Sequence, residues 1–368
     1  MLCRPPPGRM KDATTTRGLD SQPISESHHH DRASSTGSRP QWERTDAPRV
    51  AEYDVTTKAE QGADVTEPTL KPVIDEERNA VRAFRPFSSL VRIDVSALTH
   101  PGLVRANNED QFFVSRLSRA LETMLSSLPA GEIPARADEV NYVMVVADGM
   151  GGHAAGEIAS RLAIRTLIGL GLEVPDWIFR IDEEHASEIQ RRARRIVQQV
   201  GAELSDFGRQ EAALRGMGTT LTAARSYGRD LLIVHVGDSR AYLFRSGRLI
   251  RLTKDHTYAQ LLVDTGQMQA HDAAASDVRH ILINALGGTV DDVQVDVDVA
   301  GLEDGDRLLL CSDGLTDCVD DDTIAKTLLA TQPSSEACAR LVQLALDGGG
   351  RDNITVIVAA YTFPPLSK

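Results

Sequence analysis

The sequence predicts an α+β fold built in layers and argues against a doubly wound parallel sheet. Short apolar strands follow one another between residues 219 and 254, separated by turns that contain glycine. Among them, FRSGRL is typical of a β-hairpin, in which neighbouring strands run antiparallel. The predicted helices come in pairs, at 154–204 and at 321–346, set apart from those strands. Hairpin-connected strands and paired helices favour antiparallel sheets with helices packed against them.

The first predicted elements alternate between strand and helix patterns. LVRIDVSALT, from residue 90, places Val91, Ile93 and Val95 on one face of a strand, and NYVMVVAD, residues 141–148, is typical of a buried strand. Residues 154–170 and 183–204 carry apolar side chains at helical spacing. The later predicted elements are, in order, the strands TTLTAARS, LLIVHVGD, AYLFRSG and RLIRLTKD, helices at 257–264 and 277–286, strands at 293–299 and DRLLLCSD, helices at 321–330 and 334–346, and the strand NITVIVAAY.

The composition indicates an acidic chain with an aliphatic core. The 368 residues carry a formal net charge of -13; 41% are hydrophobic and only 4% are aromatic. The acidic balance argues against nucleic acid as a partner, because phosphate backbones require clustered Lys and Arg, and it suits a protein that binds cations. No apolar run approaches the roughly 20 residues of a membrane helix, and the N-terminus has no apolar signal core. We therefore expect a cytoplasmic protein without a membrane segment.

Residues 1–88 differ in composition from the rest of the chain. They hold nine of the sixteen prolines, are rich in Ser, Thr, Asp, Glu and Arg, and show no apolar periodicity. Such a segment cannot bury enough apolar surface to offset the entropy lost on ordering. We expect residues 1–88 to form a disordered N-terminal extension, with local structure near 73–87, and residues 89–363 to form the folded domain.

Carboxylates recur at the ends of the predicted strands, each beside a glycine or another small residue. They are Asp148 in VVADGMGG, Asp238 in VHVGDSRAY, Asp313 in LLCSDGLTD and Asp352 in GGGRDNITV, with Glu109 and Asp110 in a fifth cluster, VRANNEDQF. Carboxylates brought together repel one another, and a divalent cation removes that repulsion. All-oxygen ligands suit Mg²⁺ or Mn²⁺, whereas the four cysteines have no zinc spacing. The pattern predicts a multi-carboxylate metal site, with ordinary Asp-Gly turns as the alternative.

An ordered series of motifs resembles a known enzyme family. GLVRANNED, ADGMGGHAAGEIAS, GMGTTLT, VGDSRAY, LTKDHT, NALGG, LLLCSDGLTD and GGGRDNITVIV follow one another from about Val91 to Tyr361. Together they resemble the metal-dependent serine/threonine protein phosphatases of type 2C, in their bacterial form. The resemblance implies a four-layer α-β-β-α sandwich of two antiparallel sheets flanked by helices. It also implies a metal cluster in a cleft at one end, so residues 89–363 would be the catalytic domain.

The resemblance assigns metal roles residue by residue. Asp148 would bridge two cations, Mn²⁺ or Mg²⁺, and the carbonyl of Gly149 would bind one of them. Asp313 and Asp352 would complete the ligands of the first cation. The remaining implied ligands are Glu109 and Asp110 at the second cation, directly or through water, and Asp238, which would join Asp313 at a third, weaker site.

The resemblance further implies direct hydrolysis of a phosphate monoester. A water shared by the two cations would attack in line without a phosphoenzyme, since cations lower the pKa of bound water, and Arg105 would hold the phosphate. The alternative for Arg105 is an ion pair with Glu109 or Asp110. Many animal members have a histidine, assigned as the general acid, directly after the Asp-Gly pair. This chain has Met150 there, so His153 is the candidate, with fixing of the glycine turn as its alternative role.

Two segments are expected to vary within the family. Residues 115–140 are long for the interval between the first motifs and resemble an amphipathic helix followed by a Pro/Gly loop, an inserted helix or hairpin near the cleft. Residues 255–287 correspond to the flap beside the cleft, where substrates could be selected. His271 and His280 fall in this flap, and we interpret both as solvated or hydrogen-bonded histidines.

The predicted function is a metal-dependent protein serine/threonine phosphatase that acts on phosphorylated proteins and opposes a Ser/Thr protein kinase, as a monomer. A non-catalytic pseudophosphatase that binds phosphoproteins is the main alternative, and the complete carboxylate set argues against it. A HAD-type phosphatase requires an Asp-x-Asp-x-Thr/Val motif, and DVDVA at 296–300 has Ala300 in the last position. A structural cation-binding protein is disfavoured because the chain has no EF-hand-like loop.

Overall fold

The computed structural model describes residues 88–129, 131–151, 154–173, 186–274, 276–288 and 292–364. The predicted disordered extension, apart from Ser88, and the predicted local structure at 73–87 lie outside these residues. Within the described part, no helix has the length and apolar character needed to cross a membrane.

Five strands form the smaller antiparallel sheet. In spatial order they are β1 (Arg92–His100), β12 (Ile354–Thr362), β11 (Arg307–Cys311), β7 (Arg240–Arg245) and β8 (Arg248–Arg251). The turn between β7 and β8 is the predicted FRSGRL hairpin. Its central residues Ser246 and Gly247 have φ angles of 50° and 80°, and positive φ at both positions is typical of the tight turns that match the twist of paired strands.

The larger sheet is also antiparallel and contains the strand that leads to Asp148. Its spatial order is β10 (Asp296–Gly301), β6 (Asp230–Val236), β5 (Leu221–Tyr227), β3 (Arg136–Met150), β4 (Gly218–Thr219) and β9 (Leu286–Gly287), with β2 (Asp110–Glu122) paired beside β3. The strand predicted at 293–299 corresponds to β10, which lies slightly later in the chain, at Asp296–Gly301.

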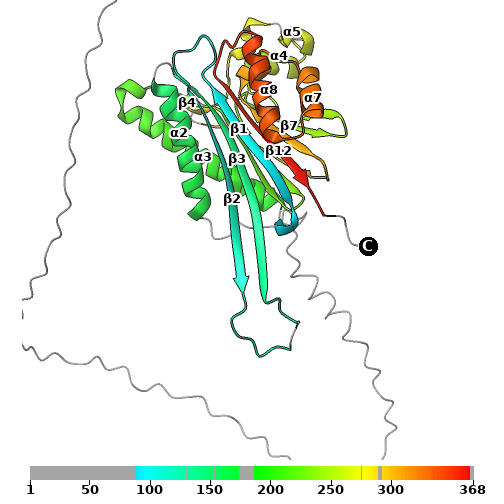
Figure 1. The fold of residues 1–368 in the computed structure, drawn as a ribbon. Helices are drawn as coiled ribbons and strands as arrows, with labels where there is room; N and C mark the ends of the chain where they lie inside the picture. The colour runs from blue at the N-terminus through cyan, green and yellow to red at the C-terminus, as the bar shows by residue number, and fades with distance from the viewer. Residues whose placement is uncertain are drawn as a thin grey trace, which may run out of the picture. The chain divides into compact units, whose positions relative to one another are not determined.

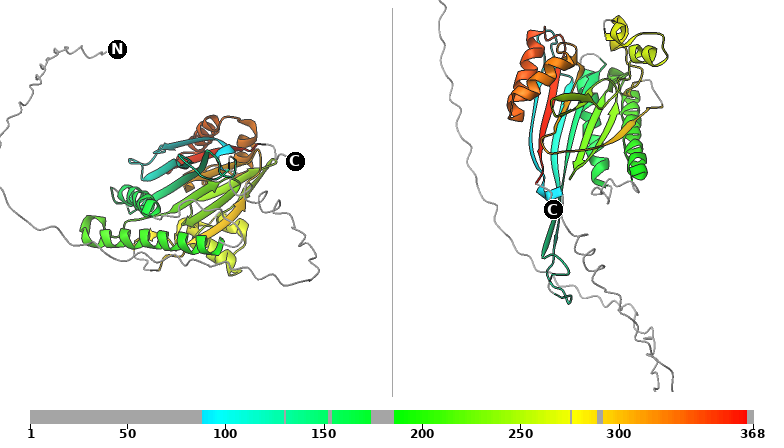
Figure 2. Two further views of the ribbon diagram at one scale, coloured as in Figure 1. Left: turned by 90° about the horizontal axis from the view of Figure 1, so that it is seen from below. Right: turned by 90° about the vertical axis from the view of Figure 1, so that its right-hand side faces the viewer.

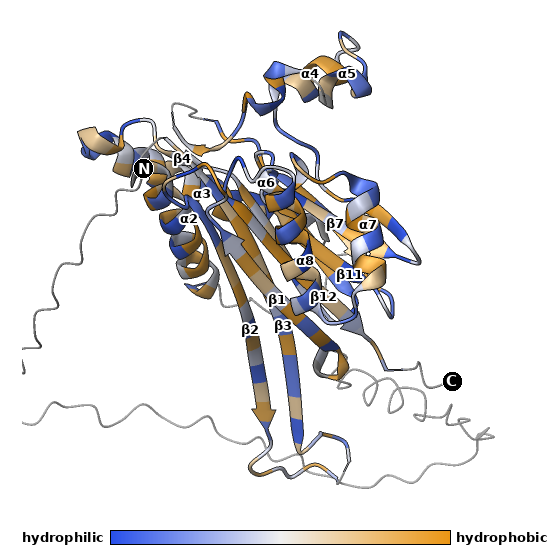
Figure 3. Cartoon of the chain, turned by 45° about the horizontal axis from the view of Figure 1, so that its top comes forward, coloured by the Kyte–Doolittle hydropathy of each residue, from blue (hydrophilic) through white to orange (hydrophobic). Residues whose placement is uncertain are grey.

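Helices cover the outer faces of both sheets, as Figure 2 shows in its right-hand view. The helices α2 (Ala154–Glu173) and α3 (Ala186–Gln210) pack on the larger sheet through Val145, Leu221 and Val236 among others, while α7 (Asp321–Ala330) and α8 (Ser334–Asp347) pack on the smaller one. A third core of aliphatic side chains, including Met144, Ile233 and Leu310, lies between the sheets. Apolar residues accordingly follow the strands in Figure 3. The predicted four-layer sandwich is confirmed.

Short helices complete the described chain. They are η1 (Ser88–Leu90), η2 (Ala212–Leu214), α4 (Tyr258–Asp264), α5 (Ala270–Ala274), η3 (Asp277–His280) and α6 (Asp313–Thr316). The predicted helix at 257–264 is confirmed as α4, which begins after Thr257, whose hydroxyl accepts a hydrogen bond from the backbone N–H of Gln260.

The helix predicted at 277–286 is wrong. Only the 3₁₀ turn η3 forms, and the chain then runs extended to β9. The backbone N–H of Tyr258 donates to the carbonyl of Ile281, and that of Ile283 donates to the carbonyl of His256. Pairing with the start of the flap therefore satisfies backbone groups that a helix would have used locally.

The helical interpretation of residues 115–140 is also wrong, and the hairpin alternative is right. β2 and β3 pair continuously from Asp110 opposite Asp148 to Glu122 opposite Arg136, and Figure 1 shows this hairpin extending beyond the sheets. Twelve residues of strand span about 40 Å, so the tip lies far from Asp148 and the expected position near the cleft is wrong. Pairing with β3 prevails over the helical spacing of SRLSRALETML because it extends a register already fixed by the core.

Candidate active site

Most of the predicted site residues meet in one cleft. The cleft has a volume of about 950 Å³, and seven of the nine predicted residues line it: Arg105, Glu109, Asp148, Gly149, Asp238, Asp313 and Asp352. Asp110 is buried beside Asp148, its partner in the sheet. A second hollow of about 590 Å³ lies between α2, α3 and the larger sheet, but its walls are mainly apolar and carry none of these carboxylates. The first cleft is therefore the candidate active site.

The end of β3 holds Asp148 in a fixed backbone position. Its N–H donates to the hydroxyl of Thr220 (3.0 Å), and its carbonyl accepts from the N–H of Thr220 (2.9 Å) and the hydroxyl of Thr219 (2.8 Å). The strand thus delivers the carboxylate to the cleft while three hydrogen bonds prevent the backbone from rotating. A side chain placed this way is pre-organised for binding.

Two glycines allow the start of α2 to lie directly against this strand end. A Cβ on Gly149 would lie 2.1 Å from the carbonyl oxygen of Gly156, and a Cβ on Gly156 would lie 2.2 Å from Oε2 of Glu109. No larger residue fits without moving the backbone. The glycine-rich stretch after Asp148 therefore packs strand, helix and Glu109 together, a role separate from the carbonyl ligation predicted for Gly149.

Asp110 forms the buried floor of the site. Its Oδ2 accepts a hydrogen bond of 2.6 Å from the hydroxyl of Ser312, which in turn accepts one from the N–H of Thr355. Its Oδ1 is buried and has no hydrogen-bond partner among the described residues. Buried carboxylate oxygens are costly when unpartnered, so this atom fits a site that a cation or its bound water completes.

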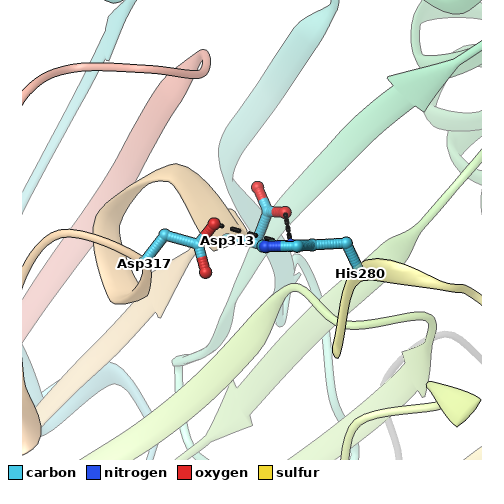
Figure 4. Close-up of side chains that lie close together, drawn as sticks. All are labelled: His280, Asp313 and Asp317. Carbon is cyan, nitrogen blue, oxygen red and sulfur yellow. Dashed lines mark ion pairs between the residues drawn. The ribbon is translucent and has the colours of Figure 1, made fainter. Parts of the chain in front are cut away.

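Asp313 has a similar environment on the other side of the cleft. It begins α6 and exposes about a fifth of its side chain, yet its Oδ1 is buried without a partner in the described chain. Asp317, one helical turn later, and His280 from the flap lie beside it, as Figure 4 shows. His280 Nδ1 is 3.5 Å from the Asp317 carboxylate and 3.9 Å from that of Asp313. Each of the three offers one ligand atom, and these atoms lie within 4.8 Å of one another.

Sequence reasoning missed the contributions of Asp317 and His280. The spacing of Asp313 and Asp317 in SDGLTD was a usable signal, because residues four apart share one face of a helix. His280 gave no comparable signal, since the flap is placed by tertiary contacts. The sequence predicts a solvated or hydrogen-bonded histidine, and the structure places His280 partly exposed at the cleft, next to two carboxylates.

The loop before β12 links Asp352 to the Arg105 segment. Arg105 Nη2 donates to Asp352 Oδ2 at 2.6 Å, and this hydrogen bond, followed by the charge of Asp352, raises the pKa of Arg105. The partner is 247 residues away and is neither Glu109 nor Asp110, the two partners that the sequence suggests for Arg105. Asn353, which sequence reasoning also missed, accepts from the N–H of Glu109 and donates to the carbonyls of Pro101 and Asn107. Its place directly after Asp352 was the only signal.

The electrostatics of the cleft favour cation binding. Burial, then the charges of Asp110 and Asp313, hold the pKa of Asp148 well above its usual range. Burial, then Asp238 and Asp317, does the same for Asp313. Burial also raises the pKa of Asp238 to about 7 and that of Asp110 to about 6. Carboxylates that resist ionisation together fit a group of oxygen ligands for divalent cations.

These shifts predict that the metal-free protein loses stability as the pH rises. The folded state retains protons on Asp110 and Asp238 above pH 4, where the unfolded chain has released them. Because the folded state binds more protons, the free energy of unfolding falls between about pH 4 and 7. Burial lowers the pKa of His235 to about 4. Below the usual pKa of histidine the unfolded chain therefore binds the extra proton, and His235 makes the free energy of unfolding rise with pH in that range.

The measurement therefore compares wild type with Asp238→Asn in EDTA. Thermal unfolding from pH 5 to 8 is expected to show the Tm of wild type falling relative to that of the variant, because only wild type carries and loses the proton of Asp238 near pH 7. His235 is common to both proteins and cancels in the difference. A constant Tm difference over this range would contradict the raised pKa of Asp238.

Two predictions on catalytic groups stay predictions. His153 lies outside the described residues, so its catalytic role is not tested. Burial raises the pKa of Cys311 to about 12 and that of Cys338 to about 11, so both of these thiols remain protonated near neutral pH. Cys318 lines the cleft and Cys3 lies outside the described residues, so hydrolysis without a cysteine nucleophile remains an expectation.

Comparison with known proteins places this chain in a family. A family model described as protein phosphatase 2C matches residues 134–346. The chain belongs to the protein phosphatase 2C family. The serine/threonine protein phosphatase PstP of Mycobacterium tuberculosis is 38% identical over 264 residues, which cover 72% of this chain and 44% of the relative. The serine/threonine phosphatase stp of Listeria monocytogenes is 38% identical over 216 residues, 59% of this chain and 83% of the relative.

The same family supplies a similar solved structure. A crystal structure of the catalytic domain of PstP in complex with two manganese ions shares 36% identity, with a TM-score of 0.57, and the match covers 74% of this chain and 99% of that one. The resemblance to type 2C phosphatases is confirmed. This chain spans less than half the length of the full mycobacterial relative.

Proposed function

We propose that this chain is a protein serine/threonine phosphatase that hydrolyses phosphoserine and phosphothreonine monoesters with the help of bound Mn²⁺ or Mg²⁺. The observation that carries the proposal is the convergence of Asp148, Asp313 and Asp352 with Arg105 in one cleft. Three carboxylates beside one guanidinium combine a cation site with a phosphate contact. The names of the mycobacterial and Listeria relatives, and the two manganese ions in the PstP crystal structure, support it.

The proposed cation ligands fall into three groups. Asp148 would contribute to both of two cations, and the carbonyl of Gly149 would bind one of these two. Asp313 and Asp352 would complete the ligands of the first cation. The second cation would be held by Glu109 and Asp110, directly or through water. A third, weaker site is proposed at Asp238 and Asp313, next to Asp317 and His280. The buried unpartnered oxygens of Asp110 and Asp313 support this assignment.

The chain's own residues would position the substrate. When bound, divalent cations lower the pKa of water and offset charge on phosphoryl oxygens. Arg105, now paired with Asp352, would exchange that carboxylate for two oxygens of the phosphate, which its planar fork can hold together. The exchange would release Asp352 to act as a cation ligand. The three hydrogen bonds that the backbone of Asp148 makes with Thr219 and Thr220 would keep the carboxylate in place throughout.

The organisation of the chain and its partners belong to the same proposal. We assign residues 89–363 to the catalytic domain, 1–88 to an N-terminal extension and 255–287 to the flap. The substrates would be phosphorylated proteins, and an opposing Ser/Thr kinase is the partner that this chemistry requires. A monomeric state and a cytoplasmic location are further expectations from the sequence.

The test is hydrolysis of p-nitrophenyl phosphate and of a phosphothreonine peptide by the purified full chain. Turnover is expected with Mn²⁺ or Mg²⁺ and should be abolished by excess EDTA, then restored by added metal. Full activity in EDTA would contradict the cation site. Binding of the phosphopeptide without turnover in Mn²⁺, by a protein with a normal unfolding transition, would instead support the pseudophosphatase alternative.

A further inference from the structure

The candidate cleft contains two arginines besides Arg105, the proposed phosphate contact. Arg279 and Arg351 line it together with Arg105. Arg105 has Asp352 as its partner at 2.6 Å, and Arg279 Nε lies 3.7 Å from the Asp317 carboxylate. Arg351 is exposed and makes no ion pair or hydrogen bond through its side chain within the described part of the chain. Arg351 is therefore a cation at the cleft that no acid of the described segments engages.

The backbone that carries Arg351 is held against the segment that carries Arg105. The N–H of Leu103 donates to the carbonyl of Gly350 at 2.7 Å, and the N–H of Gly350 donates to Ala345 at the end of α8. Gly102 lies so close that a Cβ there would be 2.2 Å from the carbonyl oxygen of Asp352. These contacts fix the two arginine-bearing loops relative to each other, and both arginines line the same cleft.

Arg279 adds a second cation from a different element. It lies in η3 of the flap, directly before His280. Its distance of 3.7 Å from Asp317 is longer than a hydrogen bond. A peptide that placed its phosphoryl group at Arg105 would carry its neighbouring residues past the loop of Arg351 and the flap. The side chains flanking the phosphoresidue would thus meet guanidinium groups.

We propose that Arg351, assisted by Arg279, selects phosphopeptides that carry a second anionic group next to the phosphoresidue. This inference rests on the proposed phosphatase function and names its substrate class. A carboxylate of Asp or Glu, or a second phosphoryl group, supplies the shared chemistry, because both accept paired hydrogen bonds from a guanidinium. Neutral flanking residues gain no such contact, and basic ones are repelled. The contact is exposed, so the preference is modest and sensitive to salt.

The test compares peptides that share one phosphothreonine and differ only in the flanking residues. One set carries Glu, one Gln, one Lys and one a second phosphorylated residue. With the full chain at saturating Mn²⁺ and low salt, kcat/KM is expected to be about threefold to tenfold higher for the Glu peptide than for the Gln peptide. High salt should reduce this ratio. A preference for the doubly phosphorylated peptide alone would assign the contact to a second phosphoryl group.

Variants at Arg351 identify the source of the preference. Arg351→Gln is expected to bring the ratio of Glu to Gln peptide close to one, and Arg351→Lys should keep part of it, since charge remains but the fork is lost. Arg248→Gln, a surface arginine on β8 outside the cleft, is the matched control and should keep the full ratio. The inference is overturned if wild type hydrolyses neither the Glu peptide nor the doubly phosphorylated peptide faster than the Gln peptide, or if Arg351→Gln leaves the wild-type preference unchanged. Failure of wild type to hydrolyse any peptide overturns the proposed function itself.

Discussion

Asp148→Asn is expected to reduce hydrolysis of p-nitrophenyl phosphate by about a thousandfold or more. Asp148 is the carboxylate proposed to bridge two cations, and asparagine keeps its shape while removing its charge. Losing stabilisation of about 4 kcal/mol in the transition state corresponds to this factor. Steady-state kinetics with Mn²⁺ measure the loss, and isothermal titration should show that tight Mn²⁺ binding has disappeared with it.

The same strand offers a matched control for Asp148→Asn. Asp138 lies earlier on β3, where its exposed carboxylate pairs with Arg136, and Asp138→Asn should leave kinetics and Mn²⁺ binding unchanged. Burial, and then the charges of Asp110 and Asp313, raise the pKa of Asp148, so the metal-free Asp148→Asn protein should melt above metal-free wild type at pH 7.5. That gain in Tm shows that lost activity is not lost folding. An active variant with normal Mn²⁺ affinity would contradict the bridging role.

The sequence predicts those site residues that lie at the ends of strands. Asp148 and Asp313 each come directly after or near the end of an apolar run, and such runs form central strands whose ends share an edge of the sandwich. The approximate positions of most strands follow from the same apolar patterns. In β3, β11 and β12 consecutive residues are buried, so each of these strands contains an unbroken apolar run in the sequence. Apolar patterns do not show which strand ends meet in space. The ordered series of motifs predicts this through the family resemblance, which implies that strands far apart in sequence meet at one cleft.

The remaining features depend on contacts that local patterns do not encode. SRLSRALETML has helical spacing, yet it continues β2 because Asp110 is already paired with Asp148. Residues 281–283 likewise follow the flap's own backbone pairing. His280 acquires its acidic neighbours only through the position of the flap.

Arg105 illustrates how far a motif can assign a role without naming its contacts. GLVRANNED marks it as a phosphate contact by resemblance, while its nearest acids in sequence are Glu109 and Asp110. The structure instead gives it Asp352, a proposed cation ligand, as its partner. The pairing with Asp352 changes the effect that removal of Arg105 is expected to have on Mn²⁺ affinity. Without Arg105, Asp352 has no competing cation, so Mn²⁺ affinity should be maintained or increased.

Arg105→Ala is therefore expected to separate phosphate binding from metal binding. Loss of a charge-assisted contact costs roughly 1.5–3 kcal/mol, so kcat/KM for a phosphothreonine peptide should fall by about one to two orders of magnitude, mainly through KM. The inhibition constant of inorganic phosphate should rise by a similar factor, which reports on the anion contact without turnover. Arg105→Lys should recover part of the loss, since an ammonium keeps the charge but cannot hold two oxygens through a fixed fork.

Arg136→Ala, at the surface of β3 and away from the cleft, is the control for Arg105→Ala and should leave all these quantities unchanged. Isothermal titration with Mn²⁺ and kinetics at saturating metal are measured on each variant. If Arg105 served only to neutralise Asp352, its removal would change Mn²⁺ binding and leave KM at saturating metal as in wild type. An Arg105→Ala protein with normal KM and normal phosphate inhibition would refute the phosphate contact, whatever its affinity for Mn²⁺. A raised KM with Mn²⁺ affinity equal to or above that of wild type supports it, because only substrate binding then depends on the guanidinium.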